Sequence, residues 1–261
     1  TTFLSCVSSD KGGGIYFYDR GSAVINKICS INCSSTGSNG IFYYNCVSKT
    51  KYYKNDVNLT TISSINSTRG HPIYIYYGTI QISKTNESFI SCSTTSAYRI
   101  QPSGSDGEIT GMVTFSTFYN TTATSYRCLN FGSCSSRIQN KIVSCNVIKN
   151  SQTDTSEGVI TFYESTEVEG TCILQNYGPI ILYNSGRTVS LSNCVTDFGS
   201  QTYGAFNIKN VPATTFINSL THFASAECEA MYEVTGINRQ QTICFTAGAA
   251  YQKGIQLFLS L

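Results

Sequence analysis

The chain of 261 residues is only 12% charged, and its 17 lysines and arginines against 15 aspartates and glutamates give a formal net charge of +2. Since these cations are scattered, the sequence indicates neither a nucleic-acid partner nor attraction to an anionic membrane surface. No apolar run approaches the roughly 18 to 20 residues of a membrane helix, so we expect no membrane insertion by this segment. Good helix formers are scarce while Ser, Thr, Asn, Gly and Tyr are abundant, which favours an all-β fold.

A tetrapeptide recurs along the chain. Its first residue is usually apolar or Ser, its third is Asn or Ser, and its last is Cys or Ser. The copies, in chain order, occupy residues 3–6, 30–33, 64–67, 89–92, 142–145, 191–194 and 216–219, with weaker copies ending at Cys172 and Cys244. If one further copy near Thr121 or Cys128 is allowed, the steps between successive copies cluster around 26 residues, a period that suits one coil of a β-solenoid and predicts about nine coils.

Short strands with alternating apolar residues lie between the tetrapeptides. They are expected at residues 14–17, 40–43, 57–59, 73–75, 80–82, 158–162, 178–182, 189–191 and 204–206, and several begin with Gly. Tight turns follow many of these strands, at residues that tolerate positive φ. A tyrosine column is expected beside the turns, formed by Tyr18, Tyr44, Tyr77, Tyr163 and Tyr183. Each coil is predicted to hold about three short strands and a variable polar loop.

Stacking such coils pairs every strand in parallel and buries the inward side chains in one continuous core. We therefore predict a single parallel β-helix domain over residues 1–261, with residues 224–261, which depart from the repeat, as a cap or an incomplete terminal coil. The right hand follows from the general handedness of parallel crossover connections. A β-sandwich is the alternative, but it has no reason to repeat a Cys position. The register is least determined over residues 93–140.

Seven of the 12 cysteines are assigned to one position of the repeat and would form a cysteine ladder: Cys6, Cys33, Cys92, Cys145, Cys172, Cys194 and Cys244. The favoured interpretation is a buried column of small side chains, and disulfides between adjacent coils remain the alternative. A metal site is disfavoured because no Cys-x2-Cys pair is present and the two histidines, His71 and His222, are far apart. No metal ligand, cofactor-binding residue or catalytic residue is assigned.

Two motifs resemble those of a known family. Residues 12–15 read Gly-Gly-Gly-Ile and residues 42–45 read Phe-Tyr-Tyr-Asn. They resemble the Gly-Gly-Ala-Ile and Phe-x-x-Asn tetrapeptides of the polymorphic membrane proteins of chlamydiae and of their expanded trichomonad relatives, with Gly for Ala in the first. The resemblance covers most of the chain as a repeat style, although its motifs are short and structural. It implies a right-handed β-helix, a cell-surface or extracellular location, an adhesin-like role, and a place within a longer anchored protein.

The leading functional hypothesis is a non-enzymatic surface solenoid, with an adhesion, recognition or structural role. Its partner would be an unknown protein or glycan. The alternative is a polysaccharide lyase or glycoside hydrolase of the pectin-degrading type, which requires paired carboxylates or a calcium site. Acidic residues concentrate only at Asp154, Glu157, Glu164, Glu167 and Glu169, and we expect these to form a solvated charged edge rather than a calcium site. The chain is therefore predicted not to be an enzyme.

Overall fold

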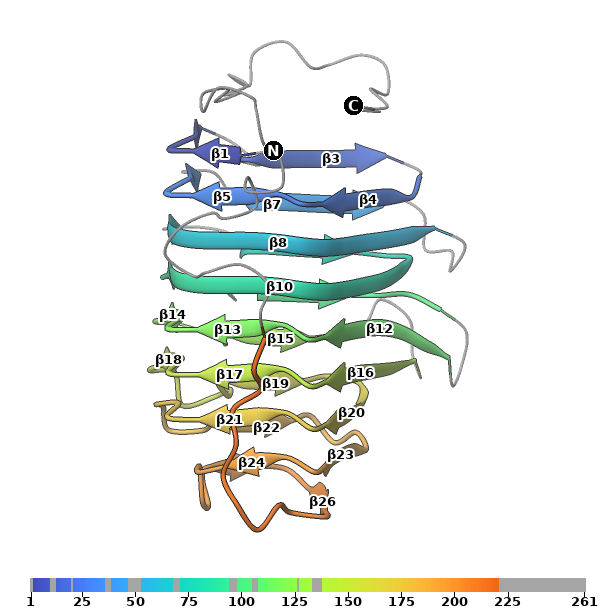
Figure 1. The fold of residues 1–261 in the computed structure, drawn as a ribbon, viewed down its shortest axis with the longest axis vertical. Helices are drawn as coiled ribbons and strands as arrows, with labels where there is room; N and C mark the ends of the chain where they lie inside the picture. Colours follow the sequence, from blue (N-terminus) through green and yellow to red (C-terminus); the bar gives the residue numbers. More distant parts are fainter. Residues whose placement is uncertain are drawn as a thin grey trace.

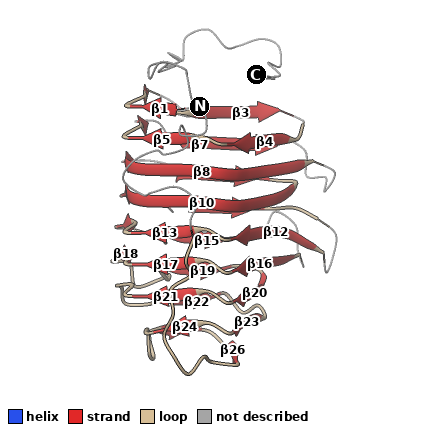
Figure 2. Cartoon of the chain, viewed as in Figure 1, coloured by secondary structure: helices blue, strands red, loops and turns tan. Residues whose placement is uncertain are grey.

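The computed structural model describes residues 2–9, 13–19, 21–35, 39–46, 53–67, 71–93, 98–104, 108–125, 127–132 and 138–220. Over these ranges the protein is all-β and contains no helix (Figure 2). The strands form one sheet of 18 strands, here called sheet 1, and one of 8 strands, here called sheet 2. Within the described part, no helix is long and apolar enough to cross a membrane.

Sheet 2 lies behind sheet 1 in the view of Figure 1. Its strands are β3 (Ile15–Asp19), β7 (Asn39–Cys46), β9 (His71–Tyr76), β11 (Tyr98–Gln101), β15 (Leu129–Phe131), β19 (Ile160–Phe162), β22 (Leu182–Asn184) and β25 (Thr202–Tyr203). Sheet 1 contains β1 (Thr2–Leu4), β2 (Val7–Ser8), β4 (Ala23–Asn26), β5 (Cys29–Ile31), β6 (Ser34–Ser35), β8 (Lys54–Ser67), β10 (Thr79–Cys92), β12 (Ile109–Thr114), β13 (Thr117–Tyr119), β14 (Thr122–Ala123), β16 (Gln139–Val143), β17 (Asn146–Ile148), β18 (Ser151–Gln152), β20 (Ser165–Glu169), β21 (Cys172–Leu174), β23 (Val189–Ser192), β24 (Val195–Thr196) and β26 (Phe206–Lys209).

All paired strands are parallel and stack in chain order (Figure 1). The step between register partners varies: Cys29 pairs with Thr61, 32 residues later, and Cys172 pairs with Val195, 23 residues later. Loops between the strands absorb this difference. The predicted all-β, parallel architecture is thus confirmed, and two stacked parallel sheets are consistent with a β-solenoid.

The core lies between the sheets and is built from like residues in register. In β10 the alternation is visible directly, since Ile80 and Ile82 are buried while Gln81 between them is exposed. In sheet 2 the aromatic rings of Phe131 and Phe162 stack with centroids 5.9 Å apart, and Tyr98 adjoins Phe131 at 6.1 Å. Parallel in-register pairing thus aligns the same column of side chains across successive strands, which gives one continuous apolar core.

The chain bends in sheet 1 at corners where residues adopt positive φ. One column of such corner residues contains Lys27, Leu59, Lys84, Phe115, Ser144, Gly170 and Asn193, and a second contains Ser5, Asn32, Ser64, Phe89, Asn120, Lys149 and Gln175. Positive φ is uncommon for residues other than Gly, and it is a genuine outlier for bulky ones. Its recurrence in register indicates that the stack imposes the corner geometry.

A small side chain that can donate a hydrogen bond follows most residues of the first corner column. These buried residues are Thr60, Thr85, Ser116, Cys145, Thr171 and Cys194. Each donates from Oγ or Sγ to the carbonyl two residues earlier, over distances from 2.9 to 3.5 Å. The hydroxyl also links neighbouring strands, because Thr171 Oγ1 accepts a hydrogen bond from the Cys145 N–H at 3.3 Å.

Replacing Thr171 with Val should lower the free energy of unfolding by about 1–3 kcal/mol, because the isosteric change leaves the buried Cys145 N–H and Glu169 carbonyl without this partner. Urea denaturation measures the change. Thr171→Ser is the matched control, since it keeps the hydroxyl and loses one methyl, at a cost of about 1 kcal/mol or less. A Val variant as stable as the Ser variant would contradict this role of the hydroxyl.

The prediction that the cysteines share one position of the repeat is wrong for the six that are described. Cys6 and Cys33 follow the second corner column, and Cys145 and Cys194 the first. Cys172 is instead in register with Asn146, and Cys92 with Ser67 and Ala123. Cys244 lies outside the described residues.

What Cys6, Cys33, Cys145 and Cys194 share is local geometry, because each follows a positive-φ residue and donates Sγ–H to the carbonyl two residues earlier. All six of the described cysteines assigned to the ladder are buried free thiols, as the favoured interpretation expected, and Cys128 is a seventh. Cys29 is disulfide-bonded.

Residues 211–220 form a strap that runs back along the outside of sheet 1, from the end of β26 towards β17 (orange in Figure 1). Asn218 fastens it: its N–H donates to Asn146 Oδ1 at 3.0 Å, and its Nδ2 donates to the carbonyls of Cys145 and Gly170 at 3.0 and 2.9 Å. The Cys172 thiol donates to the Phe216 carbonyl at 3.0 Å. Residues 216–219, which the sequence assigns to a further copy of the repeated tetrapeptide, therefore lie in the strap and form no strand of the stack. The cap predicted at residues 224–261 lies outside the described residues.

Candidate binding groove

The outward-facing residues of sheet 2 form two columns, and the residue types in these columns change along the stack. The first column contains Tyr16, Tyr74, Arg99, Asn130, Thr161, Tyr183 and Tyr203, which strand pairing aligns across the stack. Tyrosines thus occupy both ends, and three polar residues occupy the middle. In the second column, Tyr76 is in register with Gln101, and Gly132 and Tyr163 follow directly after β15 and β19.

The predicted tyrosine column is therefore wrong as a single column. Tyr44 is in register with Phe17 and Ile75, whereas Tyr183 is in register with Thr161 and Tyr203. Ring contacts nevertheless occur between neighbours: Tyr183 and Tyr203 stack with centroids 4.9 Å apart and planes 5° apart. Tyrosine packing along the outer face of sheet 2 is thus present, and it includes the predicted Tyr163 and Tyr183, whose ring centroids lie 6.4 Å apart.

A groove of about 500 Å³ lies where the tyrosines are replaced. It crosses β11, β15 and β19, and the turn after β22 borders it. The side chains that define its chemistry are those of Arg99, Gln101, Arg127, Asn130, Tyr163 and Arg187. Gly132 leaves space at the groove because it has no side chain. A Cβ at this position would lie only 3.3 Å from the Gln101 side chain.

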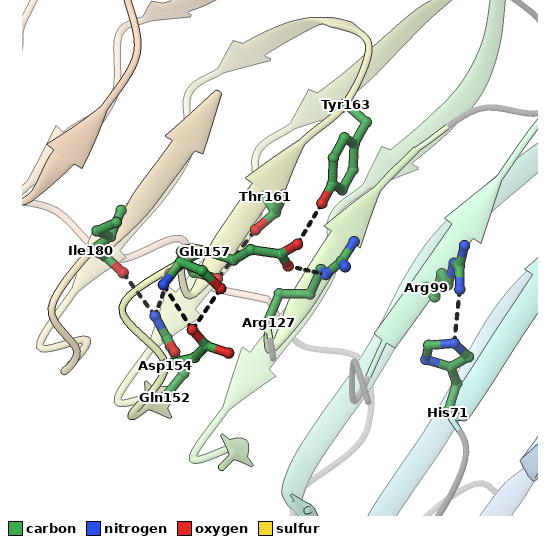
Figure 3. A network of polar contacts seen from close by, with 11 residues as sticks. His71, Arg99, Arg127, Gln152, Asp154, Glu157, Thr161, Tyr163 and Ile180 are labelled. Atoms are coloured by element: carbon green, nitrogen blue, oxygen red, sulfur yellow. Dashed lines mark hydrogen bonds and ion pairs between the residues drawn. The ribbon is translucent and has the colours of Figure 1, made fainter. Parts of the chain in front are cut away.

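One wall of the groove is a cluster formed by Arg127, Glu157 and Tyr163 (Figure 3). The Arg127 guanidinium forms an ion pair with the Glu157 carboxylate and lies over the Tyr163 ring, 4.9 Å from its centroid. The Tyr163 hydroxyl donates to Glu157 Oε1 at 2.6 Å. Burial, and then this hydrogen bond, raises the pKa of the Tyr163 phenol well above its usual range, so the hydroxyl stays protonated and remains a donor.

The loop before β19 holds Glu157 in place. Asp154 Oδ1 accepts hydrogen bonds from the Ser156 N–H and hydroxyl at 2.7 and 2.6 Å, which tightens the turn and lowers the pKa of Asp154. Gln152 Nε2 donates to the Glu157 carbonyl at 2.5 Å (Figure 3). The wall is therefore positioned by backbone contacts as well as by its own ion pair.

Arg187 forms a second wall from the turn after β22. The Asn184 side chain shapes this turn, since its Oδ1 accepts from the Arg187 N–H at 2.9 Å and its Nδ2 donates to the Arg187 carbonyl at 2.8 Å. Gly186 takes the positive φ of 92° that the turn requires. The Arg187 guanidinium donates to the Tyr163 carbonyl at 3.2 Å and lies 3.7 Å from the buried Glu164 carboxylate.

Arg99 and Asn130 are neighbours in register and contribute the unsatisfied polar groups of the groove. Arg99 Nη1 donates to His71 Nε2 at 3.0 Å, and its guanidinium lies 5.3 Å from the Tyr74 ring centroid. Among the described residues Arg99 contacts no carboxylate. Asn130 is 1% exposed, and its Oδ1 has no hydrogen-bond partner there. Buried hydrogen-bond acceptors normally have a donor as partner, and a ligand in the groove can supply this donor.

The five acidic residues singled out from the sequence do not form one site. Glu157 and Glu164 lie at the groove, each beside an arginine, whereas Glu167 and Glu169 lie on β20 in sheet 1, where both are within 4 Å of Lys141 Nζ. Asp154 belongs to the loop described above. Over the residues that the structure describes, no group of three or more His, Cys, Asp or Glu side chains could hold a metal ion.

Two of the free thiols, those of Cys128 and Cys145, are unsuited to nucleophilic chemistry. Burial raises the pKa of both the Cys128 and the Cys145 thiol to about 12, so neither forms a thiolate near neutral pH. Their hydrogen bonds are structural, as shown by Cys128 Sγ, which donates to the Ser151 carbonyl at 2.9 Å. These thiols belong to the core and not to a reactive site.

Comparison of the chain with protein-family models, with curated proteins and with solved structures finds no match in any of the three. A functional argument therefore depends on the groove itself.

Proposed function

We propose that this chain is a right-handed parallel β-helix of about nine coils that acts as a non-enzymatic recognition protein at the cell surface or outside the cell, binding a glycan in the groove of sheet 2. The fold proposal is supported by parallel in-register strands and recurring corners. The location is supported only by the resemblance of the repeat to surface proteins.

The observation that carries the binding proposal is the interruption of the tyrosine column. Four register steps separate Tyr74 from Tyr183, which corresponds to about 19 Å at the spacing of neighbouring strands. Tyrosine combines an apolar ring face with a hydroxyl, and thus suits a sugar, which has both an apolar face and hydroxyl groups. Between the rings, Gln101, Asn130 and the arginines provide hydrogen-bonding groups that fix orientation.

The contacts made by the two carboxylates at the groove favour glycan binding over glycan hydrolysis. Glycoside hydrolysis requires two carboxyl groups that flank the scissile bond, one of which protonates the leaving group while the other activates water or attacks the sugar. Glu157 is held by Arg127 and Tyr163, and Glu164 lies beside Arg187. Each of these carboxylates is thus engaged by an arginine side chain of the groove.

A glycan array probed with the purified full chain, followed by affinity measurement on the glycans that bind, tests this proposal. Replacing Gly132 with Val places a branched side chain in the groove and should weaken binding by tenfold or more, about 1.4 kcal/mol. Gly21→Val is the matched control, because a Cβ at Gly21 meets only the Phe17 ring at 3.9 Å, outside the groove. Equal binding by both variants, or cleavage of the bound glycan, would refute the proposal.

A further inference from the structure

Among the residues that the structure describes, the charges of the groove do not balance at Arg99. Of its three arginines, Arg127 is paired with Glu157 and Arg187 lies beside Glu164. The third, Arg99, has an imidazole nitrogen and a tyrosine ring as its neighbours, and neither carries a negative charge that would neutralise it. The uncompensated positive charge therefore lies at one defined point of the groove, on β11.

Asn130 adds a second requirement next to this charge. It is in register with Arg99 on the adjacent strand, and neighbouring parallel strands lie about 4.8 Å apart. A guanidinium only donates hydrogen bonds, whereas the unpartnered Asn130 Oδ1 only accepts them. A ligand that satisfies both must present an anionic acceptor and, within a few Å of it, a hydrogen-bond donor.

We infer that the groove binds an acidic oligosaccharide, in which an anionic group on one sugar pairs with Arg99 while a neighbouring hydroxyl donates to Asn130. This inference rests on the proposed function and specifies its ligand. Guanidinium matches the paired oxygens of an anionic group by donating two parallel hydrogen bonds, and such charge-assisted bonds are stronger than neutral ones. The absence of a side chain at Gly132 leaves room for a sugar ring beside Asn130.

The affinity of the full chain for three probes tests the inference. They are a hyaluronan hexasaccharide, which carries carboxylates, its carboxyl-reduced neutral form, and a keratan sulfate hexasaccharide, which carries sulfates and no carboxylates. At least one acidic probe should bind tenfold or more tightly than the neutral probe, and the preferred acid identifies the anionic group. Arg99→Gln should weaken binding of that acid by about 10- to 100-fold and should weaken binding of the neutral probe by a clearly smaller factor.

Lys141→Gln is the matched control, because it removes the same charge from sheet 1, where Lys141 pairs with Glu167 and Glu169. It should leave all three affinities unchanged. If Arg99→Gln lowers the thermal midpoint, Arg99→Lys replaces it, since it keeps the charge and loses the paired geometry, and it should weaken acid binding by a smaller factor.

Two outcomes separate this inference from the proposed function. If the neutral probe binds as tightly as both acids and loses affinity in Gly132→Val, the anionic inference is overturned while glycan recognition stands. If no probe and no arrayed glycan binds the unmodified chain, both are overturned.

Discussion

Replacing Glu87 with Ile is expected to stabilise the protein by about 1–3 kcal/mol at neutral pH. Glu87 is 2% exposed and occupies an inward position of β10, in register with Ile62 on one side and Phe118 on the other. It adjoins a small cavity of about 20 Å³ that is otherwise lined mainly by Ile and Val side chains. An isoleucine would continue the apolar column and remove a carboxyl group from the core.

The pH dependence of stability should identify Glu87 as the cause. Burial raises its pKa well above the usual 4.5, so between the unfolded and folded pKa values the folded chain binds more protons than the unfolded chain. Stability is therefore highest below about pH 4.5 and falls as pH rises towards the folded pKa, by up to about 1.4 kcal/mol per pH unit.

Urea denaturation of the unmodified chain, Glu87→Gln and Glu87→Ile between pH 4 and 8 measures this dependence. Both variants should lose the downward slope that Glu87 causes. Glu167→Gln serves as the control, since the Glu167 side chain is 47% exposed, and it should keep the slope. A Glu87→Gln variant whose stability falls with pH as steeply as that of the unmodified chain would show that the slope arises elsewhere.

Replacing Phe131 with Ala is expected to destabilise the protein by about 3–5 kcal/mol, the largest loss that we predict. The Phe131 ring is 1% exposed and lies between Tyr98 and Phe162, so truncation opens a void that contacts three successive strands of sheet 2. Each part of a stacked fold is stabilised mainly by contacts with its neighbours. The void therefore also weakens the packing of β11 and β19 against β15.

Phe115→Ala is the matched control for Phe131→Ala. The Phe115 side chain is 45% exposed and lies at a corner, so its truncation should change the free energy of unfolding by no more than about 0.5 kcal/mol. Similar losses for the two variants would contradict the assignment of Phe131 to the core.

The general architecture could be predicted from the sequence, because the repeat length and the alternating apolar residues both follow from the stacking of parallel strands. The exact register could not. A pattern of Asn or Ser followed by Cys marks a positive-φ corner before Cys6, Cys33, Cys145 and Cys194, and such corners form two columns in sheet 1. The pattern therefore matched Cys33 at one corner and Cys145 at the other.

The strap at residues 211–220 shows a second limit of the pattern. Phe216, Asn218 and Ser219 match the repeat, yet Asn218 uses its side chain to bind the carbonyls of Cys145 and Gly170 instead of forming a corner. The same residue types satisfy the same hydrogen-bonding needs in either context. Only the contacts made by the rest of the chain decide between them.

The groove was missed because it depends on a register that the sequence left undetermined over residues 93–140. A signal was present: the outward residues Tyr74 and Tyr76 of β9 are replaced by Arg99 and Gln101 in β11. That substitution becomes visible once Ile75 is aligned with Ile100. The unpaired Asn130 acceptor, in contrast, depends on side-chain positions that no repeat pattern specifies.

The path of the strap has a mechanical consequence. A pull applied on the C-terminal side of residue 220 does not act first on β26, the last strand of sheet 1. It acts on Asn218, whose hydrogen bonds with Asn146 and with the carbonyls of Cys145 and Gly170 are loaded together. Under tension, strands at this end therefore cannot unzip one by one until those bonds rupture.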